Sequence, residues 1–284
     1  MFKILQKSFS IGTATADYPN VSPRLAEQFR GCPEFEFEIW HDARPAAEAC
    51  PTGAIALRDS DGLRQVTVDY GRCIFCGECE AANADSAVRM TRKFELAAGD
   101  RRDLVLTAKY TLNPDATHAT LQSSTCGPVL DEPGKRIAAA IQNLLGRSLA
   151  IRQVDAGSCN GCEQEIVALN NPVHDIERFG IHFVASPRHA DMLLVTGPVT
   201  RNMELALRKV WAATPDPKIV VAVGACGISG GIFGANYATM GGVDAVIPVD
   251  VYIPGCPPRP EALLHGILLA LGKTRQRTRS HTFQ

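Results

Sequence analysis

Ten cysteines, three of them in one run with two residues between neighbours, constrain this 284-residue chain more than any other feature. The run is Cys73, Cys76 and Cys79, and a further cysteine precedes a proline in Cys50-Pro51. The N-terminus has neither the apolar stretch nor the twin arginine of an export signal, so we expect a cytoplasmic chain with reduced thiols. In that setting, closely spaced cysteines indicate metal binding or catalysis before disulfides.

The N-terminal cysteines fit one half of a duplicated motif. Two-cluster ferredoxins repeat C-x2-C-x2-C-x3-C-P, and the fourth cysteine of each run binds the other run's cluster. At that spacing, one site keeps a cysteine at every position: Cys50, Cys73, Cys76 and Cys79. The other site has lost all four: Trp40, Ala43, Ala46 and Asn83. The sequence therefore predicts that one [4Fe–4S] cluster remains and that the second has been lost as a unit.

A zinc ion held by the same cysteines, in a scaffold without redox function, stays open as an alternative. Zinc more often uses two separated C-x2-C pairs. Cys32 fits neither site, and we expect it to be a buried or surface thiol. Cys126 has no partner by spacing and stays unassigned.

The segment Thr13–Pro19, together with Cys50-Pro51 and Cys73–Cys79, resembles the polyferredoxin-type subunits of formate hydrogenlyase and complex I. This resemblance covers about the first 97 residues. It implies a small ferredoxin-like α+β domain at residues 1–95, with one cluster in place of two.

From residue 136 onwards, apolar runs alternate with helical patterns, after an expected connector at 96–135 that holds at most a short strand near Asp103–Tyr110. The expected strands are Leu149–Val154, His182–Ala185, Met192–Thr196, Ile219–Val223 and Ala245–Val249. The expected helices are Ile137–Leu145, Glu163–Asn170, Arg201–Ala213 and Pro260–Leu271. This alternation predicts an α/β fold at 136–273, a flavodoxin-like parallel sheet with helices on both faces, followed by a tail at 274–284.

Four further cysteines follow strands of this sheet, where an open parallel sheet binds its ligands. They lie on three loops: Cys159, Cys162, Cys226 and Cys256. Four glycines in these loops let the backbone pass close to a bulky group: Gly157, Gly161, Gly224 and Gly255. Cys162 lies at an expected helix start, where the helix dipole favours negative charge. Zinc, or a redox-active Cys159/Cys162 pair, remains the alternative from the residues alone.

These loops resemble the small subunit of membrane-bound, energy-converting [NiFe]-hydrogenases and the related 20 kDa subunit of complex I. The matching segments are Val154–Glu163, Ser186–Asp191, Thr196–Thr200, Gly224–Gly227 and Ile253–Pro258. The resemblance implies a proximal [4Fe–4S] cluster on the four rim cysteines, and hence two [4Fe–4S] clusters in the chain. It also implies a large partner subunit that holds the Ni–Fe centre, so this chain alone has no complete active site.

Complex I subunits of this type carry adjacent cysteines at the first ligand pair, whereas Cys159-Asn-Gly-Cys162 has the hydrogenase-like spacing. We therefore expect an electron-transfer subunit of a hydrogenase-type complex. A complex I-like quinone or ferredoxin oxidoreductase without hydrogenase activity is the alternative. Further ferredoxin-type or membrane subunits would hold the complex at the cytoplasmic membrane. Net charge of −1 predicts no nucleic-acid partner.

Two features outside the ligand sets carry open alternatives. Glu165 lies three positions after Cys162, and the resemblance places an acidic residue here near the large subunit; it is either a proton relay or an exposed helix acid. Phe2, Leu5 and Phe9 share one helical face, which would lie on a membrane surface or pack against the N-terminal domain.

Overall fold

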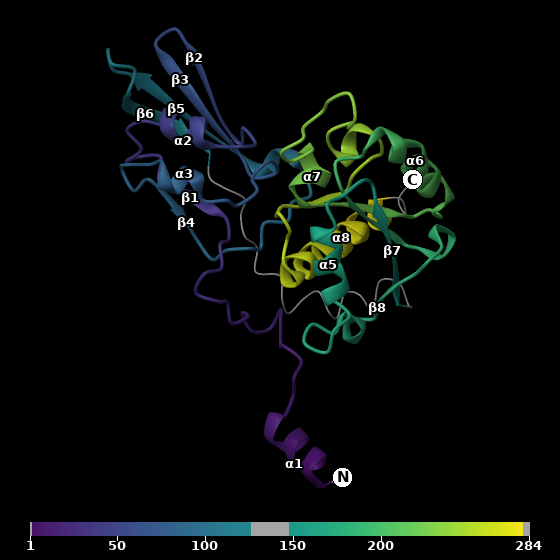
Figure 1. Cartoon of the computed structure of the whole chain (residues 1–284). Helices are drawn as coiled ribbons and strands as arrows, with labels where there is room; N and C mark the ends of the chain where they lie inside the picture. The colour runs from purple at the N-terminus through teal and green to yellow at the C-terminus, as the bar shows by residue number, and fades with distance from the viewer. Residues whose placement is uncertain (1, 126–147, 281–284) are drawn as a thin grey trace.

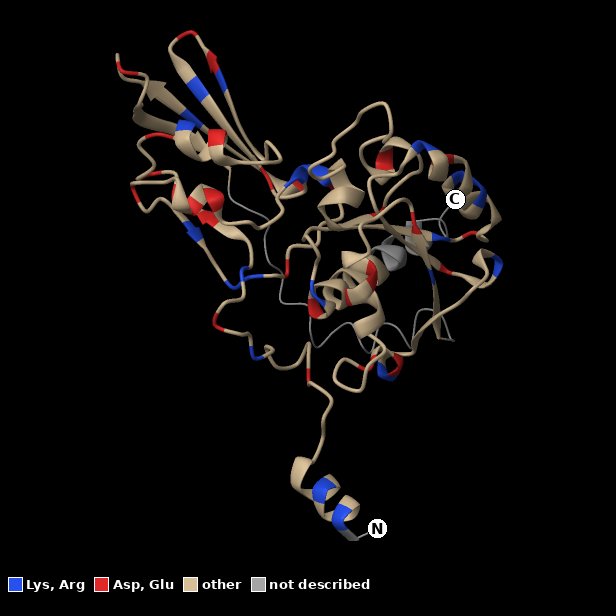
Figure 2. Ribbon diagram, viewed as in Figure 1, with Lys and Arg blue, Asp and Glu red and all other residues tan. Residues whose placement is uncertain are grey.

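The computed structural model describes residues 2–125 and 148–280 of the chain (Figure 1). The expected helix Ile137–Leu145 and the unassigned Cys126 lie outside the described residues. Figure 2 shows basic and acidic positions interspersed in both the N-terminal and the C-terminal regions. No helix among the described residues is long and apolar enough to cross a membrane.

The C-terminal region is built on a parallel sheet of five strands in the order β11-β10-β9-β7-β8. The strands are β7 (Leu149–Asp155), β8 (Ile181–Phe183), β9 (Met192–Thr196), β10 (Ile219–Val223) and β11 (Val251–Ile253). Every residue of β9 and β10 is buried, as continuous apolar runs in a two-sided sheet require. The order places the first strand inside the sheet, which is the flavodoxin-like arrangement. The predicted fold class is confirmed.

Helices cover both faces of this sheet, because alternate strand residues point to opposite sides. Leu194 and Val221 pack with α5 (Gly161–Ala168) and α8 (Pro260–Ser280) in one core. Val195 and Ala222 pack on the other side with α6 (Arg201–Ala213) and α7 (Gly224–Ser229). In Figure 1, α5 and α8 lie together in front of the strands.

The expected strand at Ala245–Val249 is wrong. A 3₁₀ turn occupies Val243–Ala245, and the last strand of the sheet is Val251–Ile253 instead. Pro248 has no backbone N–H for a sheet ladder, and the buried Val246 and Ile247 fill the core from an irregular segment. Helix α8 also runs nine residues past the expected Leu271, to Ser280, into the stretch expected to be a tail.

The N-terminal region is antiparallel. Strands β2 (Ile55–Ser60), β3 (Leu63–Asp69), β5 (Val105–Leu112) and β6 (His118–Ser124) form a four-stranded sheet in chain order. Strands β1 (Pro33–Phe35) and β4 (Val88–Met90) pair separately. Short helices α2 (Arg44–Ala49) and α3 (Glu78–Ala81) complete it, after the terminal helix α1 (Phe2–Ile11).

Two strands of that sheet come from the interval expected to be a connector, residues 96–135. Strand β5 pairs with β3 along its length, and alternate residues such as Leu106, Ala108 and Tyr110 are buried. Strand β6 is mostly exposed, and its polar residues gave no apolar alternation to detect. The N-terminal sheet therefore extends well beyond residue 95.

The two regions share one continuous apolar core. Tyr70 and Leu104 belong to the same buried cluster as Val195, Ala222 and Ile228. The backbone also joins them, because Ala98 and Tyr252 exchange hydrogen bonds at 3.0 and 2.8 Å. Their relative position is therefore set by packing and not by a linker alone.

Helix α1 lies apart from both the N-terminal and the C-terminal region of the described chain. It extends away from the rest of the chain in Figure 1, with Leu5 52% and Phe9 85% exposed. The expectation that its apolar face packs against the N-terminal domain is therefore not what the structure shows. Lys3 and Lys7 lie on the same helix.

Candidate metal centres

Three loops at the carboxyl edge of the parallel sheet bring four cysteines together. Cys159 and Cys162 follow β7, Cys226 lies in α7 directly after β10, and Cys256 follows β11. The charge of each of the other three cysteines acts on the Cys162 thiol, and Cys159 and Cys256 act on Cys226. The sequence placed these residues on one rim, and the structure brings all four to one place.

The backbone around these thiols has the close approach that a bulky group requires. A Cβ added to Gly224 would lie 2.8 Å from Cys162 Sγ, and one on Gly231 would lie 2.9 Å from Cys226 Sγ. Both glycines have positive φ, +78° and +56°. Any side chain here would occupy the space around the sulfurs, so the residues present fit a thiolate-bound cluster.

The other expected glycines serve the loops in different ways. Gly255 has a φ of +147°, and a Cβ there would collide with Pro258. Gly157 lies against Thr200, where a Cβ would meet its Cγ2 at 2.3 Å. Gly161 is only in ordinary contact distance of Cys159 Sγ, at 3.6 Å. Gly231 was missed, because it lies five residues after Cys226 with no motif of its own.

Without a bound cation these thiols resist ionisation. Burial raises the pKa of Cys162, and Glu163 and the neighbouring cysteines raise it further. Burial also raises the pKa of Cys226 to about 11, with Cys256 and Cys159 adding to the effect. Metal ligands must be thiolates, so the positive charge of bound iron would have to offset both causes.

The N-terminal site gathers the other predicted set. Its four thiols line one apolar cavity together with Phe35 and Val68, and they are Cys50, Cys73, Cys76 and Cys79. Burial raises the pKa of Cys79 to about 11, and Cys76 and Cys50 raise it further. Backbone N–H groups point at two sulfurs: Ala54 donates to Cys50 Sγ at 3.2 Å, and Phe75 to Cys73 Sγ at 3.4 Å. Such bonds favour a thiolate and tune a cluster.

Neither set is arranged for a single ion. Among the residues that the structure describes, no group of three or more His, Cys, Asp or Glu could hold one metal ion. A cubane cluster places different demands on its ligands, because each of its thiolates binds a different iron atom. Its four sulfurs therefore stand further apart than those around one zinc ion.

The positions at which the duplicated motif would place a second ligand set are filled by the core. Trp40, Ala43 and Ala46 are at most 1% exposed, and Trp40 packs on Phe35 with ring centroids 5.5 Å apart. With its side-chain amide flipped so that oxygen and nitrogen exchange places, Asn83 accepts hydrogen bonds from the backbone N–H groups of Ala87 and Val88. Side-chain packing thus occupies the place where that ligand set would lie.

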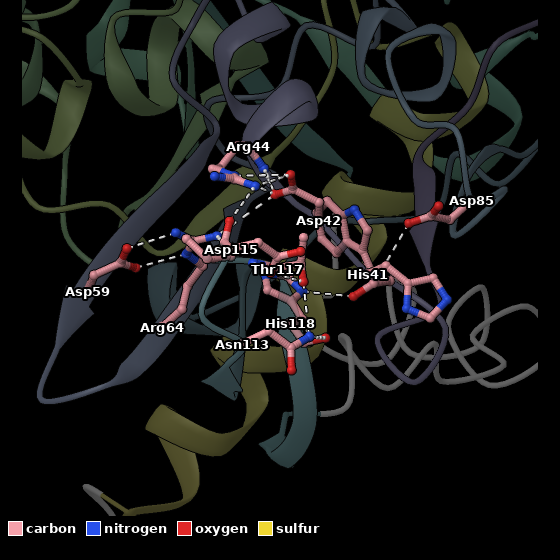
Figure 3. A network of polar contacts seen from close by, with 12 residues as sticks. His41, Asp42, Arg44, Asp59, Arg64, Asp85, Asn113, Asp115, Thr117 and His118 are labelled. Carbon is pink, nitrogen blue, oxygen red and sulfur yellow. Dashed lines mark hydrogen bonds and ion pairs between the residues drawn. The ribbon is translucent and has the colours of Figure 1, made fainter.

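A polar network lies next to Trp40 (Figure 3). His118 contacts the Trp40 carbonyl through Nδ1 at 2.7 Å and stacks on Tyr110 at 3.9 Å between ring centroids. The buried Arg64 donates to both carboxylate oxygens of Asp59. Asp42 pairs with the Arg44 guanidinium. The network ties the loop before α2 to the β5–β6 hairpin.

Cys32 belongs to neither site. It is 4% exposed in the shared core, and its sulfur lies 3.7 Å from the Thr91 hydroxyl. Burial raises the pKa of this thiol. The structure places it as a buried thiol, one of the two alternatives expected.

Two carboxylates lie on the first turns of α5. Burial raises the pKa of the half-buried Glu165, an effect that Arg259 opposes and Glu261 reinforces. Glu163 lies nearer the thiols: Thr196 donates its hydroxyl to one carboxylate oxygen, and the other is buried without a partner among the described residues. Sequence reasoning chose Glu165 and missed Glu163, although Glu163 directly follows a ligand cysteine.

Arg188 and His189 lie at the opposite edge of the sheet. They form a 3₁₀ turn that precedes β9, whereas the cysteine loops follow the strands. Both side chains are exposed and line a cavity of about 550 Å³ with His182 and Asp191. They are therefore distant from the thiols along the strand direction.

A flavodoxin-like sheet with four thiols on its carboxyl rim defines a class of α/β proteins that bind a metal cluster where the strands end. Residues 159–270 match the model of the family "NADH ubiquinone oxidoreductase, 20 Kd subunit". This match begins at the first rim cysteine and leaves the N-terminal region unassigned.

Relatives of two kinds match the same half of the chain. Formate hydrogenlyase subunit 7 of Escherichia coli is 51% identical over 52% of this chain and 58% of its own length. The probable membrane-bound hydrogenase subunit mbhJ of Pyrococcus furiosus is 54% identical over 49% of this chain and 83% of its own. A subunit of the NADH-quinone oxidoreductase of Citrifermentans bemidjiense is 52% identical over 38% of this chain and 62% of its own.

The chain therefore belongs to the family of small subunits shared by complex I-type oxidoreductases and membrane-bound hydrogenases, and the likeness lies in its C-terminal half. Members of this family bind a [4Fe–4S] cluster. The chain spans little more than half the length of the formate hydrogenlyase subunit that it matches.

Proposed function

We propose that this chain is the electron-transfer subunit of a membrane-associated [NiFe]-hydrogenase-type complex, with a [4Fe–4S] cluster at each cysteine site. The observation that carries this proposal is the convergence of four thiols on the carboxyl rim of a family-matched sheet. Cys159, Cys162, Cys226 and Cys256 would hold the proximal cluster. Cys50, Cys73, Cys76 and Cys79 would hold the N-terminal one.

The clusters supply one-electron chemistry when bound, and this chain's residues set their environment. Gly224 and Gly231 keep side chains away from the rim sulfurs. The backbone N–H groups of Ala54 and Phe75 stabilise the negative charge of two N-terminal thiolates. The chain conducts electrons, and a large partner subunit holds the Ni–Fe active site.

Exposure of the rim supports such a partner. Cys159 and Cys256 are exposed, so a cluster there would lie at the protein surface. An apolar loop follows Cys226 and is also exposed: Ile232 60%, Phe233 52% and Tyr237 93%. Apolar side chains gathered beside a functional site are typical of a surface that another protein covers.

The spacing Cys159-Asn-Gly-Cys162 favours the hydrogenase branch, since complex I subunits of this type carry adjacent cysteines. Identity does not separate the branches, because the three relatives named above, which include both kinds, lie between 51% and 54%. The second candidate is therefore a complex I-like quinone or ferredoxin oxidoreductase without hydrogenase activity. In either case we place the complex at the cytoplasmic face of the membrane, held there by partner subunits.

Glu165 is the proposed proton relay of this site. Its carboxyl is half-buried on α5, three residues after Cys162, and its pKa is raised mainly by burial. A raised pKa brings a carboxyl closer to neutral pH, where it can both accept and donate a proton. Arg259 and Glu261 lie close enough to act on its charge.

Metal analysis and an activity assay of the anaerobically purified complex test the proposal. We expect about eight iron atoms per chain from two cubane clusters, nickel in the large subunit, and hydrogen evolution from a reduced donor. Zinc without iron would contradict redox function. Eight iron atoms without nickel or hydrogen activity would favour the complex I-like alternative.

A further inference from the structure

The segments that carry the two candidate cluster sites contact each other at Gly71. Gly71 lies two residues before Cys73, and Ile228 lies two residues after Cys226 in α7. A Cβ added to Gly71 would lie only 2.7 Å from Ile228 Cγ2. The backbone of the N-terminal ligand loop therefore already touches the helix that carries a rim ligand.

Gly71 is also enclosed on a second side, by Arg101. The same added Cβ would lie 2.7 Å from Cζ of Arg101, whose guanidinium pairs with both carboxylate oxygens of Asp69. Asp69 Oδ1 also accepts a hydrogen bond from the Gly71 N–H at 2.9 Å. Gly71 is thus enclosed between an ion-paired guanidinium and a side chain that is 2% exposed.

The surrounding core gives the contact little freedom to open. Tyr70, next to Gly71, belongs to the same buried cluster as Ile228. The backbone bridge between Ala98 and Tyr252 also holds the N-terminal and C-terminal regions together. Gly71 does not have the positive φ that favours glycine, so the backbone conformation would accept another residue. Space, and not conformation, requires a glycine at this position.

We propose that Gly71 is a positioning residue for electron transfer between the two clusters, and this inference rests on the two-cluster function proposed above. The absence of a side chain lets the Cys73 loop and the Cys226 helix approach to van der Waals contact. A direct route would then run from Cys73 through Arg72 and Gly71, across to Ile228, and through Gly227 to Cys226.

The step along this route would transfer one electron and no other group. With a cluster bound at each site, one electron would leave the reduced cluster, which would be oxidised by one unit, and the other cluster would be reduced by one unit. No bond forms or breaks, and no proton moves. Because tunnelling falls steeply with distance, a small separation of the loops slows the step without altering either cluster.

Gly71→Ala in the complete complex tests this. We expect about eight iron atoms per chain as in the unaltered protein, and unchanged electron paramagnetic resonance spectra of each cluster alone. The magnetic interaction between the two reduced clusters should weaken, and freeze-quenched electron transfer between them should slow severalfold. Gly272→Ala is the matched control, because a Cβ there meets nothing within 4 Å and φ is ordinary.

A second change makes the result specific. Ile228→Ala combined with Gly71→Ala removes the methyl group that the new Cβ would meet on α7 and leaves the contact with Arg101, so it should recover part of the magnetic interaction and rate that Gly71→Ala loses. Unchanged interaction and rate in Gly71→Ala would overturn the proposal. If that variant loses iron, Ile228→Ala alone decides, since it deletes the contact without crowding: slower transfer supports the route and an unchanged rate contradicts it.

These outcomes separate the inference from the proposed function. A complex without nickel or hydrogen activity would overturn the hydrogenase assignment while leaving the interaction between clusters intact. A chain with only about four iron atoms would overturn the two-cluster function and the inference with it. Two clusters whose interaction ignores Gly71→Ala would overturn the inference alone.

Discussion

The two cysteine sites rest on very different amounts of regular structure. The rim site extends from β7, β10 and β11 of a five-stranded sheet whose central strands are buried throughout. The N-terminal site lies between α2 and α3, helices of six and four residues, beside the two-stranded β1–β4 pair. Such short elements form few hydrogen bonds of their own. We infer that the rim site is held by its fold, whereas the N-terminal site helps to hold its surroundings.

The largest expected effect comes from removing one ligand at each site. Cys226→Ser and Cys73→Ser should each lose about four iron atoms per chain. In Cys226→Ser, amide protons of β9 and β10 should stay protected from exchange. In Cys73→Ser, protection should collapse around α2, α3 and β1–β4, because the proposed cluster would contribute folding free energy there.

Cys32→Ala is the matched control for these substitutions, since Cys32 is a buried cysteine outside both sites. It should keep the full iron content. Protection is measured by hydrogen exchange and mass spectrometry. An equal loss of protection around both sites would contradict the inferred difference between them.

The next effect concerns the filled site. Trp40→Ala should lower the free energy of unfolding by about 3–5 kcal/mol, because Trp40 is 1% exposed against Phe35 and Phe37. Denaturant titration followed by fluorescence or circular dichroism measures this. Trp40→Phe should cost much less. A loss below about 1 kcal/mol for Trp40→Ala would mean that packing does not replace the lost ligation.

A smaller effect is expected at the rim. Glu165→Gln should lower hydrogen evolution about tenfold, which is about 1.4 kcal/mol in the activation free energy, with iron content and cluster spectra unchanged. The exposed Glu177→Gln is the control. A Glu165→Gln complex with the full catalytic rate would assign the residue to the helix surface and refute the relay.

The smallest effect is a pH dependence near the filled site. Burial lowers the pKa of His118, so the folded state holds the neutral ring. The unfolded chain then binds more protons below a pH of about 6.5, and stability is complete above that pH and falls as the pH drops below it.

His118→Gln should flatten this part of the stability curve, measured as the difference in Tm between the variant and the unaltered protein from pH 7.5 to 5.5. The exposed His189→Gln should leave the curve unchanged. An unaltered slope in His118→Gln would show that other groups set the pH dependence of the N-terminal region.

The parts predicted well from sequence are those with a local signal. Cysteine spacing is a local property of the chain, and the structure brings each predicted set together. Met192–Thr196 and Ile219–Val223 match their strands residue for residue, because a continuous apolar run has few other places in a two-sided sheet.

The parts missed depend on distant contacts. Helix α7 begins at Gly224 and contains Gly227, residues that weaken any helical pattern, yet β10 and the rim position it. Gly71 carries no signal in the sequence, since its requirement comes from Ile228, more than 150 residues further along the chain. The polar residues of β6 can be recognised as a strand only from their pairing with β5.

The two sides of the N-terminal region, one at Trp40 and the other at Cys50, therefore differ in what they offer to an electron-transfer partner. On the Trp40 side an electron donor would meet a tightly packed aromatic core, with no redox centre to shorten its path. On the Cys50 side the proposed cluster lies beneath half-buried loops. In the proposed complex, the loss of one ligand set would therefore do more than shorten a chain of clusters, because electrons would enter or leave the N-terminal region on the side of Cys50 and not on the side of Trp40.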